Sequence, residues 1–456
     1  MISRKISVAL IHNGFLVTVD SKIYKMIYPY RIWKNFSKEL HLEFTHSVAV
    51  FLTYHLCFSS KVILDYQFPS PLLLPFIVHG FLDTLPEALL EFPKAHFSKE
   101  SLWELLYKST FNLRFTSEKT TILTHRSHPI NARSAMLPFS FGKDSLLTYA
   151  LCTELGLKPR LIFFQEPTSK SETDNKLQLS QKFTKEFGVS ITFFPVDLGR
   201  LRQTSGYLWG WDLLCTQYTF LLLPFIFSER AHYLFWSSEQ NVNQKIHKHN
   251  IPIQINYELG NRWLLQLNNL LRLFHSNTEI GSIIEPIYEL NSLYILHHRY
   301  PQIAKYQLTC DNESKTFKKK RWCGHCTECA RMYLYMKALN VSPESIDLKE
   351  NMFHASKKKY FPILNEIHPK STLSYQYHQD RLLAFYLAYK RGIKGELINL
   401  FVKLYLPQVE KQKQHLVNEF STIHPYSTIP ALLKKRLETI FTQELTAFRH
   451  EAMSLF

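Results

Sequence analysis

The sequence predicts an α/β fold built on a parallel sheet, with an N-terminal α+β part and a helical C-terminal part. From residue 134 onward, short apolar runs alternate with longer amphipathic ones, the pattern of βα units. Two long amphipathic segments, over 380–406 and 429–448, are typical of helices. A chain of 456 residues also exceeds the size of one ordinary domain. We therefore expect domains over 1–130, 131–340 and 341–456.

The N-terminal part is expected to begin with a hairpin. Asn13 and Gly14 stand between two alternating apolar runs, and this dipeptide favours a tight turn. Apolar spacing over about 38–56 and 100–112 then predicts helices. Polar residues interrupt the first apolar run and no small-residue cleavage site follows it, so no secretory signal is expected. This part contains no pattern typical of catalysis.

The central part alternates predicted strands and helices. The first strand is expected at 134–139, and its helix over 145–155 is expected to end near Gly156. Helices through residue 187 and over about 212–229 would connect the later strands. Those strands are expected at RLIFFQEP, SITFFPVDL, HYLFW and SIIEPIYEL, which cover residues 160–167, 190–198, 232–236 and 282–290. Such crossovers give parallel strands whose carboxyl ends share one edge of the sheet.

A glycine and a charged pair stand between the first strand and its helix, in the segment LPFSFGKDSLLTYAL. A helix N-terminus presents unpaired N–H groups and a partial positive charge, which suits a phosphate. Gly142 lets the backbone approach an anion because it has no Cβ. Ser140 and Ser145 can add hydroxyl donors, Lys143 can add a full charge, and Asp144 indicates a bridging Mg²⁺. The spacing is not that of a Walker loop. We expect these residues to bind phosphate, with Lys143, Asp144 and Ser145 taking part in catalysis.

The segment SFGKDS, residues 140–145, resembles the S-G-G-x-D-S motif of the PP-loop ATP pyrophosphatases. The resemblance implies a HUP-like parallel sheet sandwiched by helices. It also implies that ATP and Mg²⁺ bind there, that ATP is cleaved to AMP and pyrophosphate, and that a carboxylate or carbonyl oxygen is adenylated. By the same resemblance, FQEP at the end of the second strand would lie beside the adenine. Glu239, which follows the fourth strand, would lie near the phosphates.

Phe141 departs from this motif, because the family usually has its first glycine there. A phenylalanine disfavours positive φ and is expected to crowd the loop. A degenerate site, or an ordinary strand-to-helix turn with a polar cap, therefore stays open as an alternative.

Four of the seven cysteines gather between residues 310 and 329. Cys323, Cys326 and Cys329 form C-x-x-C-x-x-C, and Cys310 lies upstream of them. Four thiolates can close a tetrahedral Zn²⁺ shell, and an iron–sulfur cluster would use the same ligands. His325 could replace one of these ligands but is interpreted as a bystander. With the upstream cysteine, RWCGHCTECAR resembles the zinc site of the 7-cyano-7-deazaguanine synthases. It also resembles a late segment of the adenylating L-glutamate epimerase of peptidoglycan precursors.

The formal charge of +16 favours acidic partners such as nucleotides, phosphorylated metabolites or RNA. The charge is spread along the chain, so a small-molecule substrate is expected, and nucleic acid is allowed but not favoured. The basic runs KTFKKKRW and KKK at 357–359 could follow a phosphate backbone, but they are interpreted as solvated loops around a metal site. No apolar run is long enough to span a membrane, so no membrane partner is expected. The clustered cysteines favour metal binding in a cytoplasmic protein, and a homodimer is left open.

Four functions follow from these observations. The leading one is an AMP-forming adenylating enzyme similar to the 7-cyano-7-deazaguanine synthases. The others are an adenylating L-glutamate epimerase, a tRNA-modifying PP-loop enzyme and a non-catalytic nucleotide-binding regulator. Near the C-terminal helices, the residues Tyr377, His378, Asp380 and Arg381 are interpreted as capping and surface groups.

Overall fold

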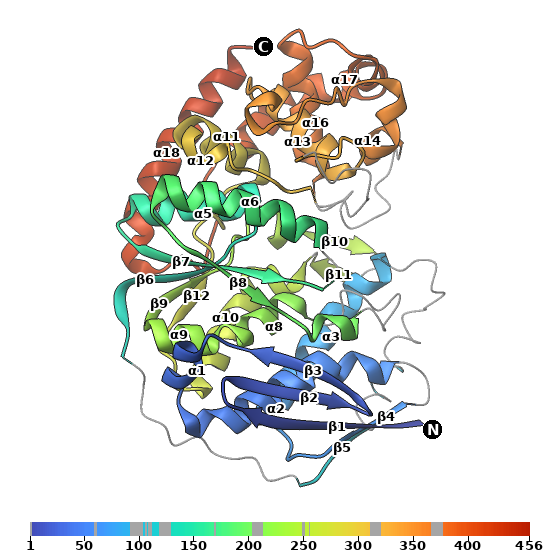
Figure 1. The fold of residues 1–456 in the computed structure, drawn as a ribbon. Coiled ribbons are helices and arrows are strands. Elements are labelled where there is room, and N and C mark those ends of the chain that lie inside the picture. Colours follow the sequence, from blue (N-terminus) through green and yellow to red (C-terminus); the bar gives the residue numbers. More distant parts are fainter. Residues whose placement is uncertain are drawn as a thin grey trace.

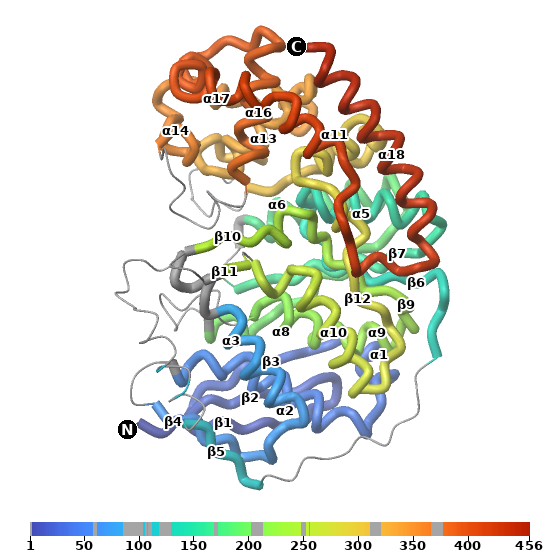
Figure 2. Tube along the Cα trace, turned by 180° about the vertical axis from the view of Figure 1, so that it is seen from behind, coloured from blue at the N-terminus to red at the C-terminus, as the bar shows by residue number. Residues whose placement is uncertain are grey.

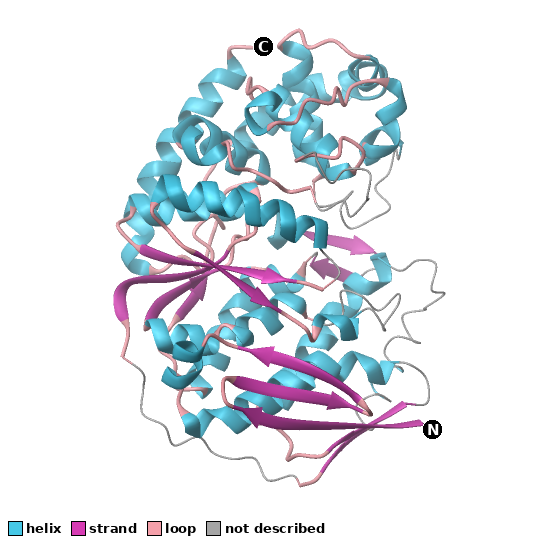
Figure 3. Ribbon diagram, viewed as in Figure 1, coloured by secondary structure: helices cyan, strands magenta, loops and turns pink. Residues whose placement is uncertain are grey.

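The described residues of the computed structural model form a mixed α/β structure with two five-stranded sheets, one two-stranded sheet and a helical C-terminal part (Figure 1). The structure describes residues 2–58, 62–91, 104, 107, 112–117, 129–167, 170–202, 213–248, 251–254, 256–310, 321–365 and 377–456. Figure 3 colours all strands magenta and all helices cyan, which shows the helices that lie around the two five-stranded sheets.

The N-terminal sheet has the strand order β3-β2-β1-β4-β5. Its strands are β1 (Ile2–Ile11), β2 (Gly14–Val19), β3 (Lys22–Ile27), β4 (Val62–Tyr66) and β5 (Leu113–Phe115). The predicted hairpin is confirmed, because β1 and β2 pair antiparallel with Ile11 opposite Gly14. A Cβ on Gly14 would lie 1.9 Å from the Met26 carbonyl oxygen of β3, so no larger residue fits this turn.

Helices α1 (Tyr30–Asn35), α2 (His41–Thr53) and α3 (Leu74–Glu91) accompany this sheet. The helix expected over 38–56 is confirmed by α2, which buries Phe44, Val48 and Phe51. The helix expected over 100–112 lies almost wholly outside the described residues.

The central sheet has the strand order β12-β9-β6-β7-β8, and every neighbouring pair is parallel. Its strands are β6 (Asn131–Pro138), β7 (Lys158–Gln165), β8 (Ile191–Pro195), β9 (Ala231–Phe235) and β12 (Glu279–Gly281). The accompanying helices are α5 (Lys143–Glu154), α6 (Lys170–Phe187), α7 (Gly199–Arg202), α8 (Leu214–Leu221), α9 (Leu223–Glu229) and α10 (Asn261–Leu273). The first four predicted strands and the alternation with helices are confirmed.

The fifth predicted strand, over 282–290, is wrong. The strand β12 ends at Gly281, where the expected one was to begin, and the apolar residues that follow form a buried turn. The side chain of Ser282 replaces strand pairing there, since its Oγ donates to the Ser238 carbonyl at 2.7 Å and accepts from the Ser238 N–H at 3.1 Å. A run that is apolar because it is buried on all sides has the same composition as a buried strand.

A small hairpin of β10 (Lys245–Lys248) and β11 (Ile251–Gln254) precedes α10. From Glu289 onward the described residues form helices, and those of 341–456 are helical as the sequence predicts. The helices of this C-terminal part are α11 (Glu289–Arg299), α12 (Pro301–Ala304), α13 (Thr327–Ala338), α14 (Pro362–Asn365), α16 (His378–Lys390), α17 (Glu396–Phe420) and α18 (Ala431–Met453). In Figures 1 and 2 this part lies on the opposite side of the central sheet from the N-terminal sheet.

The central sheet separates two hydrophobic cores. Met136 and Leu234 pack into the core shared with the N-terminal sheet, while their neighbours Leu137 and Phe235 pack into the core shared with the C-terminal helices. This follows from the alternation of side chains along a strand. Because both faces of the central sheet are covered, the carboxyl edge of its strands is where a ligand site is expected.

Candidate functional site

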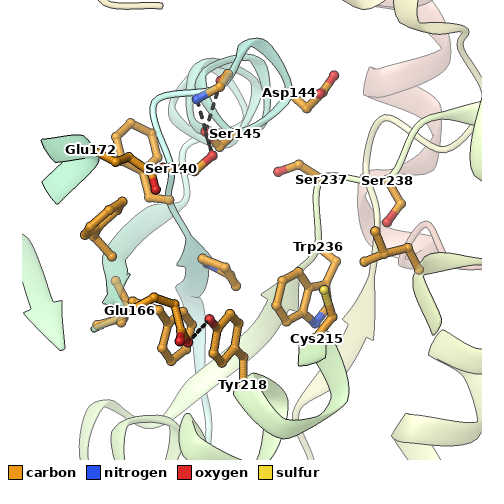
Figure 4. Close-up of a pocket in the computed structure, with 17 residues that line it drawn as sticks. Ser140, Asp144, Ser145, Glu166, Glu172, Cys215, Tyr218, Trp236, Ser237 and Ser238 are labelled. Carbon is orange, nitrogen blue, oxygen red and sulfur yellow. Dashed lines mark hydrogen bonds between the residues drawn. The ribbon is translucent and has the colours of Figure 1, made fainter. Parts of the chain in front are cut away.

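A cavity of about 340 Å³ opens at the carboxyl ends of β6, β7 and β9 (Figure 4). Four residues of the predicted phosphate loop line it: Ser140, Gly142, Asp144 and Ser145. The rest of the wall comes from the end of β6, from β7 and Glu166 after it, from α6 and α8, from the segment after β9 and from Leu259. This is the edge where open parallel sheets bind ligands. The structure therefore brings most of the predicted loop residues to one cavity.

The loop is arranged around the start of α5. The Gly142 N–H donates to Ser140 Oγ at 3.3 Å, and Ser145 Oγ donates to the Gly142 carbonyl at 3.0 Å. The N-cap residue Gly142 makes no side-chain hydrogen bond to the first N–H groups of α5. A Cβ at this position would come within 3.2 Å of Ser140 Oγ and 3.4 Å of the Thr309 methyl group. The loop thus joins hydroxyl groups to an uncapped helix N-terminus beside a cavity, which suits an anion.

Phe141 corrects one expectation. Its backbone is left-handed, with φ of +60°, although a residue with a Cβ disfavours this region. Its ring is fully buried and packs edge-on against Phe139 at 4.8 Å and Phe183 at 5.7 Å between centroids. The ring does not line the cavity. The aromatic core therefore holds the conformation that glycine adopts freely, and the loop is not crowded.

Lys143 is placed differently from the expectation that it meets a phosphate directly. Its Nζ lies 2.5 Å from Asp144 Oδ2 and 3.0 Å from Glu289 Oε1, and its side chain is 3% exposed. Burial acts to lower the pKa of Lys143, but the charges of Asp144, Glu289 and Glu239 outweigh it and raise that pKa above its usual value. The ammonium group stays charged and acts on the cavity through Asp144.

Asp144 combines one paired and one unpaired carboxylate oxygen. Oδ2 accepts from Lys143, whereas Oδ1 is buried and has no hydrogen-bond partner among the described residues. Burial raises the pKa of Asp144, and the Lys143 charge opposes that rise. A buried carboxylate oxygen beside a cavity is stabilised by a cation or a donor, so Oδ1 is suited to a metal ion that accompanies a phosphate.

Glu239 lies behind the loop instead of on the cavity wall. It is buried, and Tyr377 Oη donates to its Oε1 at 3.3 Å. Burial, followed by the charge of Asp144, raises the pKa of Glu239 to about 8. The predicted residue therefore joins the electrostatic environment of the loop, while its neighbours Ser237 and Ser238 line the cavity. In Figure 4 the Ser237 hydroxyl points into the cavity toward the start of α5.

The sequence interpretation missed the buried charges around Glu239. Tyr377, Asp380 and Arg381 are all buried, so their interpretation as surface groups is wrong. Tyr377 is the N-cap residue of α16, but its side chain makes no capping hydrogen bond. Asp380 accepts from Asn241 Nδ2 at 2.9 Å, and the guanidinium group of Arg331 lies 4.5 Å from the centroid of the Tyr377 ring. These groups are far apart in sequence, and no local pattern distinguishes them from surface residues.

Aromatic side chains form the other end of the cavity. Phe164 and Tyr218 stack with centroids 3.9 Å apart and an interplanar angle of 6°, and Trp236 lines the same end. Tyr218 Oη donates to the carboxylate of Glu166. Phe164 and Glu166 lie on the strand end where the resemblance places the adenine. Tyr218 and Trp236 were not predicted, because single aromatic residues on a helix and after a strand carry no specific signal.

The four predicted cysteines meet in space and can hold a metal ion such as zinc. Their sulfur atoms all lie within 4.8 Å of one another, although Cys310 lies upstream of the C-x-x-C-x-x-C run. The Cys323 and Cys329 Sγ atoms are 3.7 Å apart. Four sulfurs at such distances fit a tetrahedral shell with bonds of about 2.3 Å to zinc. His325 Nδ1 lies 2.7 Å from the Cys323 carbonyl oxygen instead of joining the sulfurs.

Backbone N–H groups surround these sulfurs as they do in thiolate sites. The Gly324 N–H donates to Cys329 Sγ at 3.3 Å and the His325 N–H donates to Cys323 Sγ at 3.2 Å. Gly324 has φ of +67°, which the tight turn requires. Lys357 is buried and donates to the Gly324 carbonyl at 2.9 Å. The interpretation of residues 357–359 as a solvated loop is therefore wrong for Lys357.

Comparison of the chain with protein-family models, with curated proteins and with solved structures found no match. Among the described residues, no helix combines the length and the apolar character needed to cross a membrane. The function must therefore be argued from the residues of the site.

Proposed function

We propose that this protein is an AMP-forming adenylating enzyme of the PP-loop type, with a HUP-like central domain. The observation that carries the proposal is the position of SFGKDS. It joins the carboxyl end of β6, the middle strand of the parallel sheet, to the N-terminus of α5 beside the cavity. Helix N–H groups and two hydroxyls at this edge suit the pyrophosphate part of ATP.

The two ends of the cavity support different parts of ATP. Ser140, Gly142 and Ser145 would hold the phosphates, and the unpaired Oδ1 of Asp144 would hold Mg²⁺. The stacked Phe164 and Tyr218, with Trp236, would hold the adenine at the other end. A volume of about 340 Å³ is within the range of small-ligand sites.

The catalytic contribution of the loop is electrostatic. The charge that develops on departing pyrophosphate would meet N–H dipoles that are already oriented, so little reorganisation is needed at the moment of reaction. A substrate carboxylate or carbonyl oxygen would attack the α-phosphorus and form an acyl or imidoyl adenylate. The bond between the α-phosphorus and its bridging oxygen breaks, and pyrophosphate carries away the electron pair.

The four-cysteine site has a structural role in this proposal. Zinc would bind Cys310, Cys323, Cys326 and Cys329. It would thereby link the start of α13, which carries Cys326 and Cys329, to Cys323 and to Cys310 earlier in the chain. Zinc supplies a tetrahedral cross-link and no chemistry to the reaction. The regulator interpretation rested on Phe141 alone, and the buried position of its ring removes that support.

Product analysis tests the proposal. Purified protein incubated with ATP, Mg²⁺ and candidate carboxylic or carbonyl substrates should release AMP and pyrophosphate in equal amounts. Asp144→Asn should abolish this release while circular dichroism remains unchanged. Formation of ADP by the wild type, with the same activity in Asp144→Asn, would refute the PP-loop assignment.

A further inference from the structure

A chain of alternating charges joins the first turn of α13 to the first turn of α5. Arg331 Nη2 lies 2.5 Å from Glu328 Oε2 and 3.5 Å from Glu289 Oε1. Glu289 Oε1 lies 3.0 Å from Lys143 Nζ, which is 2.5 Å from Asp144 Oδ2. The five groups therefore alternate in sign from the cysteine helix to the phosphate loop.

The middle of this chain is removed from water. The side chains of Arg331, Glu289 and Lys143 are 12%, 1% and 3% exposed. A buried charge is tolerated only while its partner is in place, and removing one partner leaves the other uncompensated. The Tyr377 ring also covers the Arg331 guanidinium group. If one of these charged groups moves, its neighbours must therefore move with it to keep the buried charges paired.

One end of the chain is attached to the four-cysteine site. Cys326 is the N-cap residue of α13 and Cys329 lies in its first turn, so Glu328 lies between two of the cysteines in sequence and Arg331 comes two residues after Cys329. A bound metal ion would cross-link this turn to Cys310 and Cys323, and its loss would leave four thiol groups with no common partner. The position of Arg331 therefore depends on the occupancy of the cysteine site.

We propose that the four-cysteine site controls the affinity of the phosphate loop through Arg331. Metal binding fixes the first turn of α13, Arg331 holds Glu289, Glu289 holds Lys143, and Lys143 orients Asp144 in the loop. Arg331 is a positioning residue in this scheme, since it does not line the cavity. The inference rests on the proposed function, because it takes the loop to be the nucleotide site.

The test measures binding of the Mg²⁺ complex of α,β-methylene-ATP, which cannot be cleaved between the α and β positions, by isothermal titration calorimetry. The wild type is compared with zinc bound and after zinc removal by a chelator. We expect zinc removal to weaken binding by about tenfold and zinc addition to restore it, a coupling of ordinary size between two sites. Unchanged affinity after zinc removal would overturn the inference and leave the proposed function standing. No binding to the zinc-loaded wild type would overturn both.

Two variants on the same helix separate Arg331 from its surroundings. Arg331→Met should bind the analogue about tenfold more weakly with zinc present, and zinc removal should then change the affinity by less than about twofold. Arg331→Lys, which keeps a positive charge, should recover part of the loss. Lys337→Met is the matched control, because Lys337 also lies on α13 but its Nζ lies over the Tyr333 ring, outside the chain of charges. A full zinc effect in Arg331→Met would overturn the proposed route.

A second measurement needs no variant and remains decisive if Arg331→Met does not fold. Coupling between two binding equilibria is reciprocal, so the nucleotide analogue must raise zinc affinity by the factor by which zinc raises nucleotide affinity. Competition between the wild-type protein and a chromogenic zinc chelator, with and without the analogue, measures that factor. Equal zinc affinity in both conditions would overturn the inference.

Discussion

At position 141 glycine should be better tolerated than alanine. Phe141 combines a fully buried ring with a φ of +60°, so the two replacements remove the same packing but differ in backbone strain. Alanine keeps a Cβ in the left-handed region, whereas glycine adopts that region freely. At ordinary positions the order is reversed, because glycine loses more conformational freedom on folding.

The expected magnitudes follow from these terms. Loss of a buried phenylalanine ring costs about 3–5 kcal/mol in either variant. Alanine additionally keeps left-handed strain of about 1–2 kcal/mol, and glycine adds about 0.5–1 kcal/mol of unfolded-chain entropy. Phe141→Gly should therefore be more stable than Phe141→Ala by up to about 1.5 kcal/mol. Urea unfolding followed by tryptophan fluorescence measures this difference as a shift of the midpoint at constant slope.

Phe139 is the matched control. Its ring belongs to the same aromatic group, 5.5 Å from Phe183, and it is not among the residues with positive φ. There alanine should be more stable than glycine by about 0.5–1 kcal/mol. If alanine is the more stable replacement at both positions, the left-handed strain assigned to Phe141 does not exist and the reasoning fails.

Three further results are expected. Because burial and Asp144 raise the pKa of Glu239 from 4.5 to about 8, its contribution to stability is greatest below about pH 4.5 and is lost as the pH rises through 8. The melting temperature of Glu239→Gln should therefore fall less than that of the wild type between about pH 4.5 and 8, and equal falls would contradict this assignment. Metal analysis should find one zinc per chain and its loss in Cys326→Ser, whereas iron with visible absorbance would exclude zinc. Ser145→Ala should slow AMP formation by an amount that corresponds to about 1 kcal/mol of activation free energy. This loss is much smaller than that expected for Asp144→Asn, and equal losses in rate would argue against the metal role of Asp144.

The parts of the fold that sequence could predict are those fixed by neighbours along the chain. The Asn13–Gly14 hairpin depends on two turn residues and their flanking alternation. The order of strand, loop and helix around SFGKDS depends on apolar periodicity, and the cysteine cluster on its spacing. In each case the information lies within a few residues of the element it determines.

The parts that sequence could not predict depend on contacts between distant segments. The apolar run after Gly281 has the composition of a strand, but side chains such as Ser282 bind the neighbouring segment and prevent pairing. Asp380 and Asn241 are 139 residues apart and are buried together. A charged residue near a helix start is ordinarily at the surface, so only the packing of α16 against the central domain shows that Asp380 is not.

The position of Lys143 shows how a contact with a residue far away in sequence, Glu289, changes the role expected for a site residue. A lysine next to a phosphate loop is expected to bind phosphate, yet direct binding here would require Nζ to leave Glu289, which is 1% exposed. The carboxylate would then remain buried without a cation, at a cost of several kcal/mol. An arriving phosphate would also meet the negative charge of Asp144. In the proposed function the anion would therefore be held by helix N–H groups, by the serine hydroxyls and by a cation on Asp144, while Lys143 would keep that carboxylate in place.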